Sequence, residues 1–298
     1  MRTDPRTLPD GRSVGALSWG CWRLVTAEVP EARRLVESAV GLGMNMLDAA
    51  DVYGLDWGGS GFGASEEMLG RVFADAPELR DRAVIATKGG IDPGVPYDSS
   101  AAYLEAAVDA SLGRLGIDHI DLWYIHRPDL FSHPADVADT LAGLVAAGKV
   151  GAIGVSNHTV AQVDALLAHL PADLPLVADQ FEYSVAHLGP LRDGTLDQCM
   201  RDNRMAVAWS PLGGGALVAP GGGHVSLLAA LDDIASDHGA SRAAVAVAFV
   251  LAHPAAPVAV IGTQDLDRIA DLATATSITL SRAECYRLIE ASEGVPLP

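Results

Sequence analysis

The fold is decided by residues 83–129, where "AVIATKGG" (83–90) is followed by "SAAYLEAAVDASLGRLG" (100–116) and then by "IDLWYIHRPD" (120–129). The first and last stretches are short and apolar, as buried strands are. The middle stretch repeats apolar residues at spacings of three and four, with Ser at its start and Gly at its end, which is typical of a helix. The segment therefore predicts a strand, a helix and a second, parallel strand.

The same alternation continues through all 298 residues of the chain. Helical patterns separate the strand-like runs, and no linker or low-complexity segment interrupts the series. Repeated units of roughly 30 to 40 residues favour a closed (β/α)8 TIM barrel over an open sheet, formed as one domain over residues 1–298. The strand-like runs lie at 16–22, 45–48, 83–87, 120–125, 151–155, 176–180, 205–210 and 257–261.

Additional elements are expected outside the repeating units. "RTLPDGRSV" (6–14) places a Pro-Asp-Gly turn between two short flanks, which predicts an N-terminal β-hairpin that caps the barrel floor. Extra helices are expected near 226–238 and 281–292. The sequence ends in "EGVPLP" (293–298), with no long C-terminal loop to close over a substrate, so we expect an open pocket.

The charge balance restricts the partners that the protein can have. The chain carries 20 basic and 38 acidic residues, a formal net charge of -18. Such a surface repels phosphate backbones and anionic lipids, so we expect neither nucleic acid nor a membrane as a partner. The most apolar run, residues 243–262, is broken by "HPAAP" (253–257), which favours a helix and a strand of globular length over a membrane span.

The cysteines indicate a reducing environment. Cys21, Cys199 and Cys285 are far apart, odd in number and without a CxxC spacing, so neither a disulfide framework nor a metal cluster is expected. The N-terminal residues lack the apolar stretch of a secretory signal. A cytoplasmic protein fits these features best.

Polar side chains follow several of the predicted strands directly: Asp48, Lys88, His126, Ser156, Asn157 and Gln180. The carboxyl ends of barrel strands all open on one mouth, where the chemistry of such barrels takes place. Lys88 is therefore expected between Asp48 and His126, and Tyr53 can fold back over them from the following loop. Since a barrel interior disfavours an unpaired ammonium, Asp48 is the natural counter-ion of Lys88.

This set of groups suits protonation of an oxygen. A free phenol has a pKa near 10, and a cation within roughly 4 to 6 Å lowers it, which would make Tyr53 a usable general acid. His126 could donate a hydrogen bond to a carbonyl oxygen. Taken singly, these residues are more often caps, turn residues, solvated charges or core histidines. Their joint placement on consecutive strand ends favours catalysis, with the electrons supplied by another molecule.

At these positions the sequence resembles the aldo-keto reductase superfamily, and in particular its members with a short C-terminal tail. "DAADVYG" (48–54), "TKGG" (87–90) and "IHRPD" (125–129) match the family's Asp, Tyr, Lys, His tetrad. The match continues through "GKVGAIGVSNH" (148–158), "DQFEYS" (179–184), "AWSPLGGG" (208–215) and "VAVIGTQDLDRI" (258–269). The resemblance implies a (β/α)8 barrel that uses a nicotinamide cofactor.

The resemblance also implies roles for single residues. Asp48, Tyr53, Lys88 and His126 would be catalytic. The cofactor would be held by Ser156, Asn157 and Gln180 at the nicotinamide carboxamide, by Trp209 on its ring, and near the pyrophosphate by the loop from Ser210 through Leu212, Gly213 and Gly214. From the residues alone, Ser156 and Asn157 could instead cap the next helix, Gln180 could be a satisfied interior amide, and Trp209 could belong to the core.

The segment after the eighth strand bears on the choice of cofactor. Family members that prefer NADPH usually have a basic residue and a later polar one where this chain has Gly262 and Leu272. Thr263 and Arg268 remain, and Arg268 could pair with a 2′-phosphate. NADP(H) is therefore favoured over NAD(H).

The expected substrate is a small carbonyl compound or the corresponding alcohol. Trp22, Trp57 and Phe131 are candidate pocket walls, with Trp57 as a possible flap in a glycine-rich loop. Two other functions are compatible with the pattern: a nicotinamide-binding regulatory or redox-sensing subunit, and a lyase that uses Lys88 as a Schiff base, which the neighbouring Asp48 disfavours. The motifs leave the natural substrate, the direction of reaction and the oligomeric state open.

Overall fold

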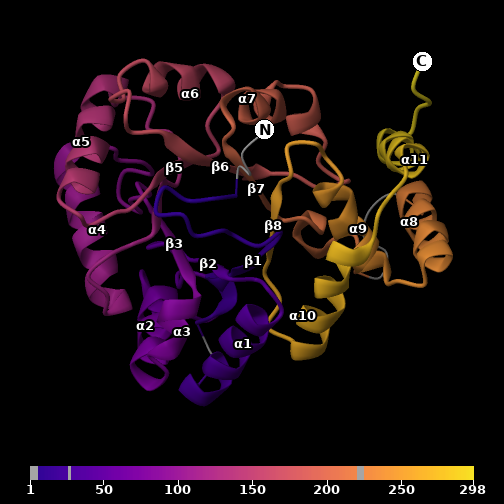
Figure 1. The fold of residues 1–298 in the computed structure, drawn as a ribbon, viewed down its shortest axis with the longest axis horizontal. Helices are drawn as coiled ribbons and strands as arrows, with labels where there is room; N and C mark the ends of the chain where they lie inside the picture. Colours follow the sequence, from indigo (N-terminus) through magenta and orange to yellow (C-terminus); the bar gives the residue numbers. More distant parts are fainter. Residues whose placement is uncertain (1–5, 26–27, 220–224) are drawn as a thin grey trace.

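The predicted barrel is confirmed. A computed structural model, which describes residues 6–25, 28–219 and 225–298, contains a closed barrel in which parallel strands follow one another in sequence order (Figure 1). The first strand is shorter than predicted, because Cys21–Arg23 forms a 3-10 turn, η1. The strands are β1 (Leu17–Gly20), β2 (Met46–Asp48), β3 (Val84–Gly89), β4 (Leu122–Ile125), β5 (Ile153–Ser156), β6 (Leu176–Glu182), β7 (Met205–Trp209) and β8 (Val258–Ile261).

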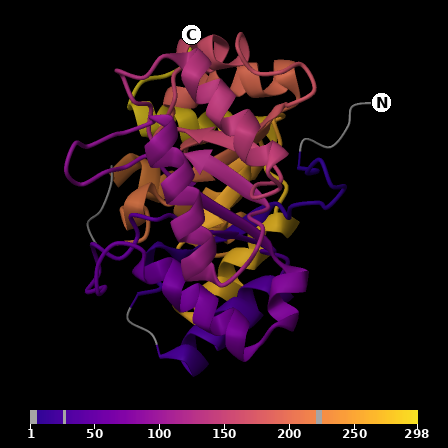
Figure 2. The same ribbon diagram turned by 90° about the vertical axis from the view of Figure 1, so that its left-hand side faces the viewer.

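Helices cover the outside of the barrel, as the view onto the α4 and α5 side makes clear (Figure 2). Both extra helices are confirmed as α8 and α11, which pack against each other beside α9 (Figure 1). The α-helices are α1 (Val29–Gly41), α2 (Ala64–Asp75), α3 (Glu78–Arg82), α4 (Ala101–Leu115), α5 (Pro134–Ala146), α6 (Val160–Leu167), α7 (Thr195–Asp202), α8 (Val225–His238), α9 (Arg242–Leu251), α10 (Leu266–Ala273) and α11 (Arg282–Glu293).

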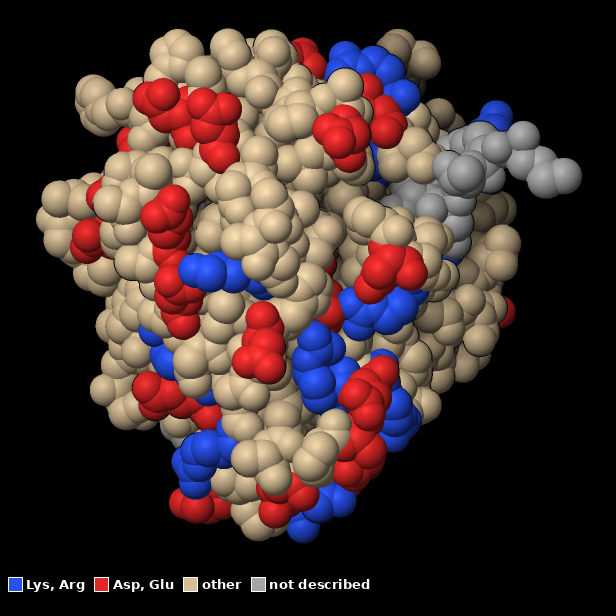
Figure 3. Space-filling model, turned by 60° about the vertical axis from the view of Figure 1, so that its left-hand side comes forward, with Lys and Arg blue, Asp and Glu red and all other residues tan. Residues whose placement is uncertain are grey.

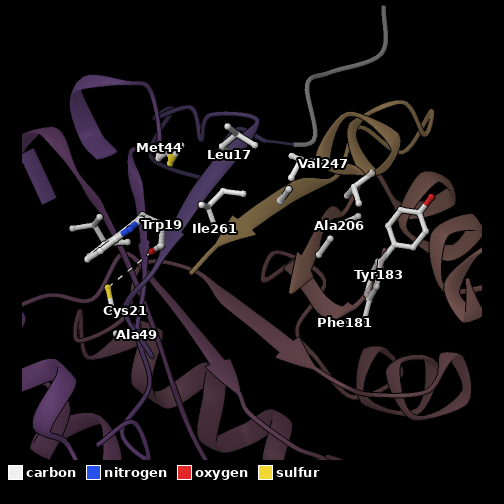
Figure 4. Packing of buried hydrophobic residues seen from close by; sticks show 14 of the residues in the cluster. Leu17, Trp19, Cys21, Met44, Ala49, Phe181, Tyr183, Ala206, Val247 and Ile261 are labelled. Carbon is white, nitrogen blue, oxygen red and sulfur yellow. Dashed lines mark hydrogen bonds between the residues drawn. The ribbon is translucent and has the colours of Figure 1, made fainter. Parts of the chain in front are cut away.

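Two hydrophobic clusters separate the inside of the barrel from the outside. Successive side chains of a strand point to opposite faces. Leu17, Trp19 and Ile261 accordingly pack outward, in the cluster between strands and helices (Figure 4). Met46 and Val84 belong to the smaller cluster, which fills the barrel. The strands are therefore buried on both faces, as their apolar composition predicts.

The N-terminal hairpin closes the floor of the barrel. Thr7 and Ser13 form an antiparallel bridge, and the backbone N–H of Leu8 donates to the carbonyl of Arg12 at 2.8 Å. Leu8 and Val14 are buried in the cluster that fills the barrel. Their side chains pack with the first residues of several strands, so the hairpin caps the end opposite to the mouth.

Charged side chains on the surface are mixed. On the face shown in Figure 3, most Lys and Arg side chains lie beside Asp or Glu side chains. Within the described residues, no helix is long and apolar enough to cross a membrane, and no cluster of His, Cys, Asp and Glu could hold a metal ion. The three cysteines are free thiols.

Candidate active site

The pleat of the strands brings the predicted polar residues to the mouth of the barrel. Met46, Ala86 and Tyr124 point into the barrel interior. Asp48, Lys88 and His126 lie two positions further along the same strands, so they point to the same side. Since parallel strands run in one direction, this side is the carboxyl-terminal mouth.

Lys88 is the centre of the site and is fully buried. Its Nζ lies 2.7 Å from Asp48 Oδ2, 2.8 Å from the carbonyl oxygen of Ala49 and 3.2 Å from Tyr53 Oη. Burial alone would lower the pKa of Lys88, but Asp48 and Tyr53 raise it above its usual value. The ammonium therefore keeps its charge, which leaves no free amine for a Schiff base.

The pKa of Tyr53 differs from the sequence-based expectation. Burial raises the pKa of this phenol, Lys88 lowers it and Asp48 raises it again, with a net increase above the usual value. The expectation that Lys88 would bring the pKa below that of a free phenol is wrong for this structure, because the loss of hydration outweighs one cation. Tyr53 consequently holds its proton at neutral pH, beside an ammonium that can stabilise its oxygen once the proton has left.

His126 lies on the other side of Tyr53. The two rings are 5.8 Å apart between centroids and meet edge to face at 81°. Burial, with the charges of Lys88 and Arg127, lowers the pKa of His126 well below its usual value, so the imidazole is neutral. Its Nδ1 is buried without a hydrogen-bond partner in the part of the chain that the structure describes. A neutral imidazole can donate one hydrogen bond to a substrate oxygen.

Gln180 contributes to the tetrad itself. Its Nε2 donates to Asp48 Oδ1 at 2.8 Å, so that both oxygens of Asp48 are hydrogen-bonded. The motifs predict a contact of Gln180 with the nicotinamide carboxamide and give no sign of this bond to Asp48. The bond to Asp48 uses Nε2, so the Oε1 acceptor of Gln180 is the atom that suits a carboxamide N–H.

Asn157 links three parts of the site. Its Nδ2 donates to Ser156 Oγ at 2.7 Å and to the carbonyl oxygen of His126 at 3.2 Å. Its Oδ1 accepts from Trp209 Nε1 at 3.0 Å. The amide of Asn157 is thus used inside the protein, which differs from the expected contact with the carboxamide. The alternative that Ser156 and Asn157 cap the next helix is wrong, because Thr159 forms the capping box of α6.

The loop after β7 begins with strained backbone. Ser210 has a φ of 52°, and Gly213 and Gly214 also adopt positive φ values. The N–H of Gly213 already donates to the carbonyl of Ser210 at 2.8 Å. Of the expected backbone donors, Gly213 is therefore occupied within the turn, whereas the backbone of Gly214 is exposed. Leu212 is partly buried and packs against the outer core cluster.

Arg268 is the first basic residue that follows β8 in the sequence. It lies in α10 with 76% of its side chain exposed, 3.9 Å from Asp265 Oδ2. The carbonyl of Thr263 accepts from the indole of Trp19 at 3.1 Å, which fixes the start of this segment. Leu272 is buried in the core, so this position cannot contact a cofactor.

The three candidate pocket walls have different surroundings. Trp22 lies 6.4 Å from Tyr53 and 5.5 Å from Trp57 between ring centroids. Phe131, however, is 99% exposed, so it forms no pocket wall in this conformation. Arg23, which was not predicted from the motifs, joins these residues, and its guanidinium carbon lies 4.2 Å from the Trp57 ring centroid. The only signal for Arg23 was its position directly after Trp22.

A second buried network, also missed, lies behind Lys88. Glu66 is fully buried and pairs with Arg114 at 2.7 Å. The carboxylate of Asp51 is buried without a hydrogen-bond partner among the described residues. Burial, and then Glu66, raise the pKa of Asp51 well above its usual value. This network faces the helices rather than the mouth, since Glu66 also accepts from Ser111 of α4.

Comparisons with known proteins identify the family of the chain. A model of the aldo/keto reductase family matches residues 16–293. The chain belongs to the aldo/keto reductase family. A Novosphingobium aromaticivorans protein named 6-dehydroglucose reductase is 45% identical over 97% of this chain and 95% of its own length. A protein of the same name from Agrobacterium fabrum is 34% identical over 96% of this chain and 97% of its own length.

Solved structures of aldo-keto reductases have the same fold. A thermostable aldo-keto reductase in complex with the inhibitor epalrestat superposes with a TM-score of 0.80 at 25% identity, over 96% of this chain and 98% of that one. An aldo/keto reductase from Klebsiella pneumoniae in complex with NADP and acetate gives a TM-score of 0.79 at 22% identity, over 99% and 97% of the two chains. This aldo-keto reductase is thus an oxidoreductase of the carbonyl-reducing class.

Proposed function

We propose that this aldo-keto reductase catalyses the NADPH-dependent reduction of a sugar-derived aldehyde to the alcohol. The observation that carries the proposal is the position of the Tyr53 hydroxyl, which lies 3.2 Å from Nζ of the fully buried Lys88. A phenol in this position can give its proton to an alkoxide oxygen, because the adjacent ammonium stabilises the phenolate that forms.

The chain's own residues would divide the proton transfer among them. The neutral imidazole of His126 donates a hydrogen bond to the carbonyl oxygen and holds it near the Tyr53 hydroxyl. As the carbonyl carbon accepts a hydride, the O–H bond of Tyr53 breaks and a new O–H bond forms on the substrate oxygen. Asp48, 2.7 Å from Lys88, keeps the ammonium in place throughout.

The residues around the tetrad fit a nicotinamide cofactor, which supplies the hydride when bound. Ser156 is buried at the end of β5, and the carboxamide oxygen of Gln180 faces away from its bond to Asp48. Trp209 is held by Asn157 and remains partly exposed, as a stacking partner must be. NADPH is proposed over NADH because Arg268 is exposed near the end of β8 and can pair with a 2′-phosphate.

The substrate class rests on the relatives and on the mouth of the barrel. Two proteins named 6-dehydroglucose reductase match this chain along nearly their whole length. The exposed indole of Trp22 lies beside the proton donor, and the exposed indole of Trp57 packs against Trp22. Aromatic faces of this kind can cover the C–H groups of a sugar. An aldehyde that carries several hydroxyl groups is therefore the proposed substrate.

The variant Tyr53→Phe tests the proposal. It keeps the ring but removes the proton, so kcat for aldehyde reduction should fall by about 10²- to 10⁴-fold. NADPH binding, followed by fluorescence titration, should be retained. The matched control is Tyr286→Phe, the same chemical change on the exposed face of α11, which should leave kcat unaltered. Equal turnover in both variants would remove Tyr53 from the mechanism.

A further inference from the structure

Arg23, Trp57 and Trp22 form a continuous stack beside the proposed active site. Arg23 ends η1 after β1, and Trp57 lies in the loop of residues 54–63 before α2. The guanidinium carbon of Arg23 is 4.2 Å from the ring centroid of Trp57. Trp57 meets Trp22 edge to face at 5.5 Å and 87°, and Trp22 is 6.4 Å from Tyr53. The stack thus extends outward from the proton donor.

The guanidinium of Arg23 has N–H groups that are available as hydrogen-bond donors. Within the described residues, no carboxylate lies within salt-bridge distance of the Arg23 guanidinium, and the guanidinium donates no hydrogen bond. Carboxylate partners are found for Arg12, Arg80, Arg114 and Arg204. A cation–π contact uses the face of the guanidinium and leaves the N–H groups at its edge available. Other described arginines, such as Arg34 and Arg127, also have no carboxylate within salt-bridge distance, so what distinguishes Arg23 is its contact with the ring of Trp57.

The loop that carries Trp57 is built to hold the ring in place. Trp57 has a φ of 60°, in the left-handed region that costs a bulky residue about 1 kcal/mol or more. The loop folds back on itself, with the N–H of Gly61 bonded to the carbonyl of Gly54 at 3.2 Å. A Cβ at Gly54 would lie 2.1 Å from the carbonyl oxygen of Gly61, so this close approach requires glycine. Trp57 is therefore fixed in an unfavourable backbone conformation while its ring stays half exposed.

We propose that this stack is a substrate subsite that binds the hydroxyl-bearing carbons of a neutral, polyhydroxylated aldehyde. The indole rings cover the C–H faces of the chain of carbons, and the N–H groups of Arg23 donate hydrogen bonds to its hydroxyl oxygens. The inference rests on the proposed function and deepens it. Arg23 is then a specificity-determining residue, because an apolar aldehyde offers it no acceptor.

A neutral polyol fits the subsite better than an anion does. The net charge of -18 repels a carboxylate or phosphate group on its approach. Two exposed aromatic rings and a single guanidinium provide mostly apolar surface with a few donors, which is the composition that a sugar needs. An anion would instead be matched by several converging cations.

Steady-state kinetics of the variant Arg23→Ala with two aldehydes test the subsite. D-erythrose carries hydroxyl groups, and butanal of the same chain length carries none. The ratio of kcat/KM for erythrose to that for butanal should fall by about 10- to 100-fold, mostly through KM, since hydrogen bonds to charged groups are lost. The control Arg34→Ala, on the exposed surface of α1, should leave the ratio unaltered. An unaltered ratio in Arg23→Ala would overturn the proposal.

Two further measurements separate this proposal from its competitors. Succinic semialdehyde is the anionic probe, and a larger loss of kcat/KM for it than for erythrose in Arg23→Ala would assign the subsite to an anion instead. Binding of erythritol, a polyol that cannot be reduced, requires no turnover. A saturable change of tryptophan fluorescence with erythritol should occur in the wild type and disappear in Trp57→Phe, and its absence in the wild type would overturn the subsite even if Tyr53 proves catalytic.

Discussion

The two ends of the barrel contain similar buried ion pairs that differ in what surrounds them. At the floor, Asp121 is buried and accepts hydrogen bonds from Arg12, Arg80 and the backbone N–H of Ile85. At the mouth, Asp48 is buried and accepts from Lys88 and Gln180. Both carboxylates are fully satisfied, so burial and pairing alone do not distinguish a structural pair from a catalytic one.

The difference lies in the cations. Arg12 and Arg80 keep 36% and 23% of their side chains exposed, so they bind Asp121 and also contact water. Lys88 is fully buried, and besides Asp48 it contacts the carbonyl oxygen of Ala49 and the hydroxyl of Tyr53. Tyr53 lies next to a neutral His126 whose Nδ1 has no partner among the described residues. At the floor, the network consists of Asp121 and its donors. At the mouth, the network continues to Tyr53 and His126, which can still exchange a proton. An unpaired group beside a satisfied pair is therefore what marks the reactive end.

The largest expected effect comes from breaking the pair at the mouth. Lys88→Met removes the cation that stabilises the phenolate and leaves Asp48 buried without its counter-ion. We expect kcat to fall by about 10²-fold or more and the free energy of unfolding to fall by about 3 to 5 kcal/mol. NADPH oxidation with erythrose and urea unfolding measure the two effects.

The double variant Asp48→Asn/Lys88→Met separates stability from catalysis. Without a buried unpaired charge, it should recover most of the lost unfolding free energy, because a neutral pair has no charge to remove from water on folding. Its kcat should stay as low as that of Lys88→Met. Recovery of activity along with stability would show that Lys88 acts only through the fold.

At the floor the opposite outcome is expected. Asp121→Asn weakens the hydrogen bonds from Arg12 and Arg80 and should lower the free energy of unfolding by about 2 kcal/mol. Because the network faces away from the mouth, kcat should change less than about twofold. Asp118→Asn, an exposed neighbour, is the matched control and should alter neither quantity. A large loss of kcat in Asp121→Asn alone would mean that the two ends are coupled.

The alternation of strand residues explains why much of the site could be predicted. Once Met46, Ala86 and Tyr124 are assigned to the barrel interior, the positions of Asp48, Lys88 and His126 follow from the pleat. Contacts between distant strands do not follow in this way. The bond from Gln180 to Asp48 joins β6 to β2 across the barrel, and no local pattern encodes it.

Loops and burial limited the rest of the prediction. Trp57 and Phe131 were both assigned to the pocket as loop aromatics, yet only Trp57 packs against the site, because its glycine-rich loop folds back while Phe131 extends into solvent. The pKa of Tyr53 was predicted in the wrong direction because the cation beside it could be read from the motif, but the degree of burial could not.

Asp179 extends the comparison to another buried carboxylate. Among the described residues, no cation lies within salt-bridge distance of its side chain. It is buried between β6 and the helices without a hydrogen-bond partner in that part of the chain, and burial raises its pKa to about 7. The folded protein thus holds this proton at a pH where the unfolded chain, near its usual 3.8, has lost it. Stability from this group is therefore lost as the pH rises from about 4 to about 7.

Asp179→Asn should remove that loss. We expect the variant to be more stable than the wild type by about 1 to 2 kcal/mol at about pH 8.5, and the difference to shrink toward zero near about pH 4, below which Asp179 is protonated in both the folded and the unfolded state. Urea unfolding of both proteins at the two pH values measures the difference. A difference that does not vary with pH would show that Asp179 does not titrate in this range.

The smallest effect is expected at Arg268, which tests whether an exposed charge at the rim of the mouth contributes to the choice of cofactor. Its side chain is 76% exposed, and Asp265 at 3.9 Å already competes for it. A 2′-phosphate pairs with such a guanidinium in water, where single ion pairs contribute up to about 1 kcal/mol. Arg268→Ala should therefore lower the preference for NADPH over NADH by about fivefold or less, measured as the ratio of the two Kd values.

The neighbouring Asp267 provides the matched change of charge. Asp267→Asn removes a repulsive carboxylate and should raise the preference for NADPH by a similar factor, while both effects should diminish at high salt because exposed charges are screened. If neither variant alters the ratio of Kd values, the exposed charges after β8 do not select the cofactor. Any preference would then come from buried groups, as the reactivity of the mouth does.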